Sequence, residues 1–178
     1  KNIVRIKALS NGAPVRLEKV DKSAWKAEPC VGPLEIEYEV YAWDLSVRSA
    51  HLDQTHGYFN GTSVFVRVHG HEDRSCTVDI CAPVTTVIGD WRVATTLKLA
   101  CAKEYGFGRY VATDYDDLID HPVEMADFSM AKFEVAGVRH EVVLTGKHKA
   151  DLDRVCVDLK KICQTHVEFF GELPEMEK

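Results

Sequence analysis

The sequence predicts a mainly β protein, α+β overall, in which an antiparallel β-sandwich or saddle is followed by a β-β-α unit. Three observations support this fold class. Short segments of alternating apolar and polar residues fill the first two-thirds of the chain, and such alternation is typical of half-buried strands. Glycines and an acidic run interrupt the pattern near residues 106–120. One amphipathic helix follows near the end of the sequence.

The clearest predicted strand covers residues 34–42, where apolar side chains alternate with glutamates. Val64–Val68 and Cys76–Ile80 show the same alternation, so both are expected to be strands. Asn11-Gly12 predicts a tight hairpin turn between two strands, and Asn60-Gly61 is a second turn dipeptide. Shorter predicted strands are Ile3–Leu9, Val15–Val20, Ala24–Ala27 and Trp91–Thr95.

The acidic run Asp114–Asp117 is expected to be an inter-domain turn, which places the first domain at residues 1–113 and a second unit at residues 114–178. The second unit contains two predicted strands, Lys132–Val135 and Arg139–Thr145, and a predicted helix over residues 151–170. Apolar residues of that helix recur three and four apart and form one stripe. A unit this small does not close its own core, so the stripe would be available for self-association.

Composition excludes several classes of protein. The chain has 46% hydrophobic and 28% charged residues with a net charge of −6; without a basic stripe it is not expected to bind nucleic acid. No apolar run approaches the roughly 18 residues of a membrane span, and no signal peptide is visible. The six cysteines form no C-x-x-C pair, so we expect reduced, mostly buried thiols and a cytoplasmic protein. A leader that had been removed would instead indicate the periplasm.

Motifs for catalysis are incomplete throughout the sequence. The H-E-x-x-H pattern of zinc hydrolases fails after both His71-Glu72 and His140-Glu141. No glycine-rich phosphate loop and no G-x-S-x-G elbow occurs. No catalytic residue and no metal ligand is therefore assigned.

The segment between Tyr41 and Val68 is the strongest candidate for function, because it is polar and aromatic between two predicted strands. Asp53 and Gln54 could hold an ammonium group, and Tyr58 could form the wall of an apolar pocket. The alternative is a long loop whose polar groups cap strand ends and whose aromatic rings pack on the sandwich rim. The full set of candidate substrate-binding residues is Asp53, Gln54, His56, Tyr58 and Asn60.

Several long strings in this order resemble the glycyl aminopeptidase family of zinc metallopeptidases, bacterial gluzincin-type enzymes that usually also carry a PDZ domain. The strings are LEKVDKSAW, YEVYAWDLSVRSAHLDQTHGYFNGTSVFVRV, DDLIDHPVEMADF, GVRHEVVLTG and DLDRVCVDLKKICQTHVEFFGELP. The similarity covers nearly the whole chain.

The resemblance implies a β-sandwich N-terminal domain followed by the beginning of a thermolysin-like catalytic domain. It also implies that the family's H-E-x-x-H helix and further ligand would lie beyond Lys178, and that some N-terminal strand would precede Lys1. Zinc is then a cofactor of the parent enzyme, which would release N-terminal Gly or Ala from peptide substrates. This piece is expected to hold no cofactor and not to be catalytic alone. By analogy with related aminopeptidases, Asp53 and Gln54 would hold the substrate's free amine.

A stand-alone, non-catalytic β-sandwich module that binds a peptide or a sugar is the competing interpretation. Burial or exposure of the predicted helix distinguishes the two interpretations. Such a module should bury the stripe between Leu152 and Val167 against its own sandwich, whereas part of an enzyme should leave much of it exposed. A scaffold without a ligand is the third interpretation, and it predicts that replacing Gln54 and Tyr58 has no effect on the parent enzyme.

Overall fold

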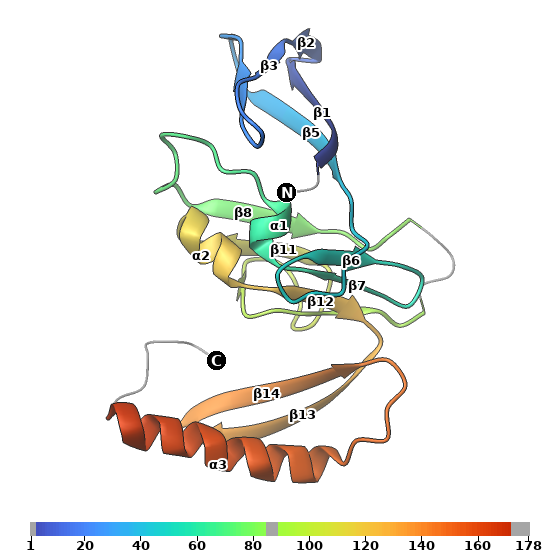
Figure 1. Cartoon of the computed structure of the whole chain (residues 1–178), viewed down its shortest axis with the longest axis vertical. Helices are drawn as coiled ribbons and strands as arrows, with labels where there is room; N and C mark the ends of the chain where they lie inside the picture. Colours follow the sequence, from blue (N-terminus) through green and yellow to red (C-terminus); the bar gives the residue numbers. More distant parts are fainter. Residues whose placement is uncertain (1–2, 85–88, 172–178) are drawn as a thin grey trace.

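The structure, a computed structural model, describes residues 3–84 and 89–171 (Figure 1). It consists mainly of short strands in antiparallel sheets, and its described residues include three helical segments. The predicted mainly β fold class is therefore confirmed. The sheets follow one another along the long axis, from an N-terminal arm through a central sandwich to a C-terminal hairpin with its helix (Figure 1).

The N-terminal arm is a sheet of order β2-β1-β5, with a two-stranded β3-β4 sheet. Its strands are β1 (Ile3–Ser10), β2 (Ala13–Val15), β3 (Leu17–Lys19), β4 (Trp25–Ala27) and β5 (Leu34–Val40). Asn11 and Gly12 have φ angles of 50° and 79°, the left-handed values that a two-residue hairpin turn requires. The predicted hairpin is confirmed. The glutamates of β5 face outward, where a carboxylate oxygen of Glu37 lies 2.7 Å from Nζ of Lys7 on β1.

Two sheets pack against each other in the middle of the molecule and enclose the main core. One has the order β10-β11-β8 and the other the order β6-β7-β12-β9. Their strands are β6 (Ala50–Leu52), β7 (His56–Phe59), β8 (Cys76–Ile80), β9 (Arg92–Ala94), β10 (Lys98–Leu99), β11 (Gly108–Ala112) and β12 (Val123–Ala126). Val93, Tyr110 and Val123 come from both sheets and expose 1%, 2% and 0% of their surface. This burial is the main stabilising contribution of the sandwich.

The strand predicted at Val64–Val68 is wrong. A short helix, α1 (Gly61–Val64), occupies its beginning, and the residues after α1 are not part of any strand. Asn60 starts the helix, because its Oδ1 accepts a hydrogen bond from the backbone N of Thr62 at 3.0 Å, a bond typical of an N-cap. The apolar side chain of Phe65 still packs against the core, so alternation here reflects burial without a sheet ladder.

The acidic run predicted to be an inter-domain turn instead begins a helix, α2 (Tyr115–Asp120). Asp114 caps α2 by accepting a hydrogen bond from the backbone N of Asp117 at 2.8 Å, and carboxylates suit the positive N-terminal end of a helix. A Cβ atom on Gly61 would lie 2.7 Å from the α2 backbone. Glycine at this position therefore lets α1 and α2 pack closely.

The sandwich continues past residue 113. In β12, Glu124 pairs with Tyr58 of β7 on one side and with Ala94 of β9 on the other, so β12 is an internal strand of its sheet. The division expected after residue 113 does not follow this pairing. We propose that the division between the two parts of the chain lies at Asp127.

After this point, β13 (Phe128–Val135) and β14 (Val138–Thr145) form a hairpin, and α3 (Leu152–Phe170) lies along it (Figure 1). These elements match the predicted strands and helix. Asp151 caps α3 through the backbone N of Arg154 at 3.0 Å, and Gly171 ends it with a left-handed φ of 77°. α3 packs on β13, yet none of its residues is buried. Phe169 and Phe170 expose 80% and 71% of their surface.

The thiols differ from expectation. All six cysteines are free, and Cys30, Cys81 and Cys101 are exposed while the others are half-buried. The prediction of mostly buried thiols is wrong, because the three exposed residues lie in irregular segments outside the strands.

In the part of the chain that the structure describes, no helix is both long enough and apolar enough to cross a bilayer.

Candidate functional site

β6, β7 and the loop before them gather aromatic and imidazole side chains on one face of the four-stranded sheet. His51 lies opposite Tyr58 and forms a bridge with Trp43 on its other side. Because directly opposite residues project to the same face, these three side chains form a row. His56 lies two residues from Tyr58 on β7 and shares that face. The next residue, Phe59, packs its side chain toward the core, so the row is on the outer face.

The side chains of His51, Asp53 and His56, which we call the hairpin cluster, lie where β6 turns into β7. Nε2 of His51 is 3.1 Å from Oδ2 of Asp53, and Nδ1 of His56 is 3.8 Å from Oδ1. The imidazole rings stack with centroids 5.0 Å apart. One nitrogen or oxygen from each residue lies within 4.8 Å of the other two. Such a group can hold an ammonium ion, exchange a proton or bind a metal ion.

Asp53 organises the turn between the two strands. Its Oδ1 accepts hydrogen bonds from the backbone N of Thr55 at 2.6 Å, from Oγ1 of Thr55 at 2.7 Å and from the backbone N of His56 at 3.1 Å. The hydrogen bonds from the Thr55 side chain and backbone, followed by the one from His51, hold the pKa of Asp53 well below its usual range. Asp53 therefore carries a negative charge at neutral pH, and Oδ2 is its less occupied oxygen.

His51 is the buried member of the hairpin cluster, with 6% of its surface exposed. The side chains of His56 and Asp53 expose 19% and 29%. Among the described residues, Nδ1 of His51 is the buried side-chain polar atom that has no hydrogen-bond partner. Buried polar atoms are nearly always paired, and an unpaired one costs about 1–3 kcal/mol. The ring of Trp43, 4.9 Å away between centroids, covers His51.

The structure brings some of the predicted substrate-binding residues together and separates one. Asp53, His56 and Tyr58 share the hairpin, and Gln54 is exposed at its tip. The Tyr58 hydroxyl donates to a backbone carbonyl in the loop before β6 at 3.0 Å, which fixes this loop against β7. Asn60 caps α1 and lies four residues beyond His56, about 13 Å along an extended strand. Asn60 therefore does not belong to the same group.

An open depression of about 360 Å³ lies between the loop before β6 and α1. Its size is near the lower end of ligand-binding clefts, which span roughly 300–1,000 Å³. Tyr41, Asp44 and Arg48 are among its lining residues. A hydrogen bond from the backbone N of Ser46, then one from the Ser49 hydroxyl, lowers the pKa of Asp44. The depression thus offers one fixed carboxylate and one guanidinium beside an aromatic ring.

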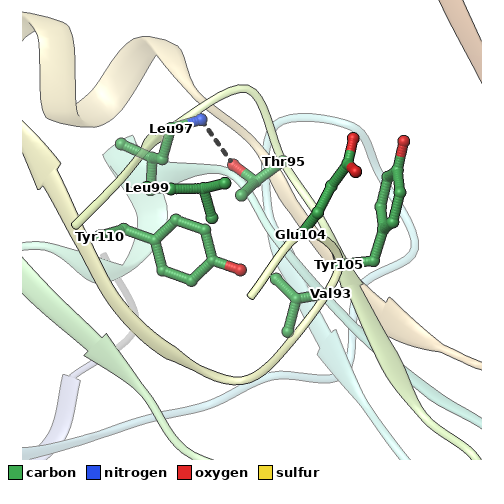
Figure 2. A pocket seen from close by; sticks show the side chains of 7 residues that line it. All are labelled: Val93, Thr95, Leu97, Leu99, Glu104, Tyr105 and Tyr110. Atoms are coloured by element: carbon green, nitrogen blue, oxygen red, sulfur yellow. Dashed lines mark hydrogen bonds between the residues drawn. The ribbon is translucent and has the colours of Figure 1, made fainter. Parts of the chain in front are cut away.

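A more enclosed cavity at the edge of the core is too small for a ligand. Figure 2 shows its lining side chains, Val93, Thr95, Leu97, Leu99, Glu104, Tyr105 and Tyr110. Its volume is about 10 Å³, which is at the limit for one water molecule. We therefore interpret it as a packing gap.

Glu141 is the centre of the contacts between the sandwich and the hairpin. Its carboxylate accepts a hydrogen bond from the Tyr105 hydroxyl at 2.6 Å and lies 3.3 Å from Lys132 and 3.0 Å from Arg139. Arg139 also donates to Glu104 at 3.0 Å. Burial alone would raise the pKa of Glu141, but these hydrogen bonds and cationic neighbours lower it overall. We call these five residues the joint network, because they tie the β10–β11 loop to the hairpin.

Other histidines have local partners. Nδ1 of His121 lies 2.6 Å from the Thr96 hydroxyl, and its Nε2 lies 3.1 Å from Asp117. His69 is 3.5 Å from Glu72 and exposes 74% of its side chain, as expected for a solvated turn. Within the described residues, neither group contains a buried donor or acceptor left without a partner.

His51 and Trp43 were not in the candidate set, although the sequence carries a signal for His51. Residues 51–56 read H-x-D-x-x-H, which differs from the helical H-E-x-x-H pattern. On a helix this spacing would scatter the side chains, but a tight hairpin folds the second histidine back beside the first. The position of Trp43 depends on the path of the loop between β5 and β6, which the sequence does not predict.

Comparisons with family models and with solved structures both found similar proteins. A family model described as the Peptidase M61 N-terminal domain matches residues 1–127. The crystal structure of an aminopeptidase N family protein from Idiomarina loihiensis resembles this chain with a TM-score of 0.92 and 38% sequence identity. That similarity covers 98% of this chain and 30% of the other, so the chain spans less than a third of that protein's length. A search of curated proteins found no match.

Proposed function

The chain belongs to the Peptidase M61 N-terminal domain family, and from this premise we propose that it is the front part of a zinc-dependent aminopeptidase that releases N-terminal Gly or Ala from peptides. The family match over 127 residues carries the proposal. The similarity to a much longer aminopeptidase N family protein supports it. The intact peptidase is expected to be bacterial and to carry a PDZ domain.

The proposed role of this chain is to contact substrate and to support the catalytic part. The sequence contains no complete H-E-x-x-H motif, so we assign none of its residues to the catalytic zinc and no chemical step to them. The row of Trp43, His51 and Tyr58 offers aromatic surface, and the ionised Asp53 beside it offers a charge complementary to a peptide's terminal ammonium. Gln54 at the exposed tip adds an amide. These groups could hold the amine end of a peptide.

The surface of α3 supports this proposal over a stand-alone binding module. The stripe between Leu152 and Val167 packs on β13 of its own hairpin, not on the sandwich, and it stays half-exposed. Within the stripe Ile162 exposes 52% of its surface, and Val157 beside it exposes 54%. A self-contained module is expected to bury such a stripe.

Peptide is the proposed partner of the intact enzyme, and nucleic acid is disfavoured by the net charge of −6. The half-exposed helix over residues 151–170 is the proposed surface for self-association of this piece. We propose a cytoplasmic location, supported by the six unpaired thiols.

The first test compares the 178-residue chain with a longer protein expressed from the same gene, using fluorogenic Gly, Ala and Leu amides as substrates. We expect activity in the longer protein alone, with kcat/KM higher for Gly and Ala than for Leu. Cleavage by the 178-residue chain, or a preference for Leu, would contradict the proposal.

The second test replaces Gln54 with Ala in the longer protein, with Gln164→Ala on the exposed face of α3 as a matched control. We expect about a tenfold loss of kcat/KM for Gly amides in Gln54→Ala, equivalent to about 1.4 kcal/mol, carried mainly by KM. The control should behave as the wild type. Equal kinetics in both variants would show that the hairpin tip does not contact substrate.

A further inference from the structure

We propose that the hairpin cluster is a metal site in which His51, Asp53 and His56 bind one divalent transition-metal ion of the zinc, cobalt or nickel type. This goes beyond the proposed peptidase function, and it revises the expectation that the chain holds no metal ligand. The proposal depends on the convergence of three donors, on their chemistry, and on a buried histidine that the protein itself uses only in part.

The donor set defines the class of metal. Two imidazole nitrogens and one carboxylate oxygen are ligands that Zn²⁺, Co²⁺ and Ni²⁺ accept, whereas Ca²⁺ and Mg²⁺ require oxygen ligands. Every donor comes from the six residues 51–56. The site is therefore built within one hairpin and does not depend on the relative position of distant elements.

The spacing of the donors is close to that of a coordinated ion. Ligand atoms of a tetrahedral zinc site with bonds of about 2.0–2.1 Å lie roughly 3.3–3.4 Å apart. The 3.1 Å contact joins Nε2 of His51 to Oδ2 of Asp53, and the 3.8 Å contact joins Nδ1 of His56 to Oδ1. One donor atom from each of the three residues lies within 4.8 Å of the other two, so the side chains would have to draw closer around an ion.

The spacing of the two imidazole rings also suits one ion. A metal about 2.1 Å from a ring nitrogen lies about 3.2 Å from the ring centroid. Centroids 5.0 Å apart would then subtend roughly 100° at the ion, between the octahedral and the tetrahedral angle. The rings are stacked at 24° to each other, so they would have to turn for both nitrogens to face the ion.

The cluster is held in place before any ion arrives. Thr55 and the backbone fix Asp53, while Trp43 and His56 lie on either side of the His51 ring. His51 makes a hydrogen bond to Asp53 alone, and its other nitrogen is buried and unpaired. Because Nε2 is the nitrogen that faces Asp53, it is the candidate ligand atom of His51.

An ion would reach the site from solvent on the side of Asp53 and His56, whose side chains are partly exposed. The Thr55 hydroxyl lies 3.1 Å from Nδ1 of His56 and could supply the fourth ligand. Otherwise water or a substrate group would fill the remaining position. The two roles proposed for Asp53 are therefore alternatives: with an ion bound, its carboxylate would be a metal ligand and would not pair with a peptide's ammonium group.

The test uses Co²⁺, whose visible absorption reports its coordination, added to the tag-free 178-residue chain under reducing conditions. We expect one Co²⁺ per chain and quenching of Trp43 fluorescence, identified by its loss in Trp43→Phe. His56→Ala and Asp53→Asn should each weaken binding at least tenfold. The latter keeps the shape of the turn, and circular dichroism checks that both variants fold. The control variant His69→Ala/His71→Ala should bind like the wild type.

Three outcomes would overturn the proposal. The wild-type chain could bind no Co²⁺ at millimolar concentration. His56→Ala and Asp53→Asn could bind as tightly as the wild type. The spectrum could show a thiolate-to-cobalt charge-transfer band, which would place the ion on the exposed cysteines. A peptidase that proves inactive on Gly amides would leave this result unchanged, so the two proposals fail independently.

Discussion

The central sandwich and the C-terminal hairpin with its helix are built from the same kinds of residue but stabilise themselves differently. The sandwich encloses Val93, Tyr110 and Val123, which expose at most 2% of their surface. In α3 no residue is buried, and Phe169 exposes 80%. The two sheets of the sandwich therefore cover the apolar core between them, whereas the apolar surface of α3 is covered only on the side that packs on β13.

The difference indicates how each part is held. Burial of apolar area stabilises the sandwich, and the hairpin cluster lies on this part of the molecule. The C-terminal hairpin, β13–β14, depends more on polar contacts with the sandwich, chiefly the joint network around Glu141. The guanidinium of Arg92 lies over the Phe128 ring at 4.1 Å and adds a cation–π contact. We expect the two parts to respond differently to substitution, to acid and to concentration.

The largest effect should come from the sandwich core. Tyr110→Ala removes a buried ring and a hydrogen bond from its hydroxyl to the Gly106 carbonyl at 2.5 Å, and we expect a loss of about 3–5 kcal/mol in unfolding free energy. Urea denaturation followed by circular dichroism measures it. Phe169→Ala is the matched control on α3 and should cost less than about 0.5 kcal/mol. Similar losses in both variants would remove the contrast between the two parts.

A smaller and local effect is expected at the joint network. Glu141→Gln removes the charge that Lys132 and Arg139 surround, and should cost about 1–2 kcal/mol. Amide hydrogen exchange should show reduced protection in β13 and β14, with β11 unchanged. Uniform loss of protection across both parts would mean that the hairpin does not open separately.

The same residue predicts a response to acid. Because the pKa of folded Glu141 lies below its ordinary value, its ionised form contributes stability that is complete above the unfolded pKa of about 4.3. That contribution is lost as the pH falls through the lower folded pKa. Amide protection factors of β13 and β14, which are corrected for the intrinsic exchange rate at each pH, should therefore fall below about pH 4.5 and do so less steeply in Glu141→Gln. Glu104, whose pKa is also lowered by its bond to Arg139, adds to the response in the same direction.

The smallest effect on stability, and a distinct one on association, is expected at the end of α3. Phe169→Ser/Phe170→Ser should change unfolding free energy by less than about 0.5 kcal/mol, because both rings are already exposed. Sedimentation velocity over a range of concentrations should show self-association of the wild-type chain and less in the variant. A wild-type chain that stays monomeric at millimolar concentration would exclude this surface as a contact between copies.

The sequence correctly predicted the elements in which turn or cap residues lie where the hydrophobic periodicity begins or ends. The Asn11-Gly12 hairpin, β5, β8, the β13–β14 hairpin and α3 are confirmed, since turn or cap residues there support the periodicity. Residues 64–68 failed because side chains of irregular backbone can alternate between core and solvent without a strand partner. The aspartates of residues 114–117 failed because acidic residues favour a solvated turn and the first turn of a helix equally.

The site was predictable in part. Alternation on β7 places His56 and Tyr58 on one face, and a carboxylate that accepts a hydrogen bond from the backbone two residues on is typical of the turn that Asp53 forms. The sequence did not predict that Asn60 caps α1, because this role depends on a helix that the alternation concealed. The approach of Trp43 and His51 is a tertiary contact, and local sequence does not determine it.

The passage from β12 to β13 has a mechanical consequence. Asp127 alone separates the two strands. The guanidinium of Arg92 lies over the ring of Phe128, the first residue of β13. The Thr145 hydroxyl donates a hydrogen bond to the carboxylate of Glu124 at 2.6 Å. Since Glu124 is paired across the sheet with Tyr58, these contacts join the C-terminal hairpin to the strand next to the aromatic row. The single linking residue therefore leaves the hairpin little room to move without also moving β12.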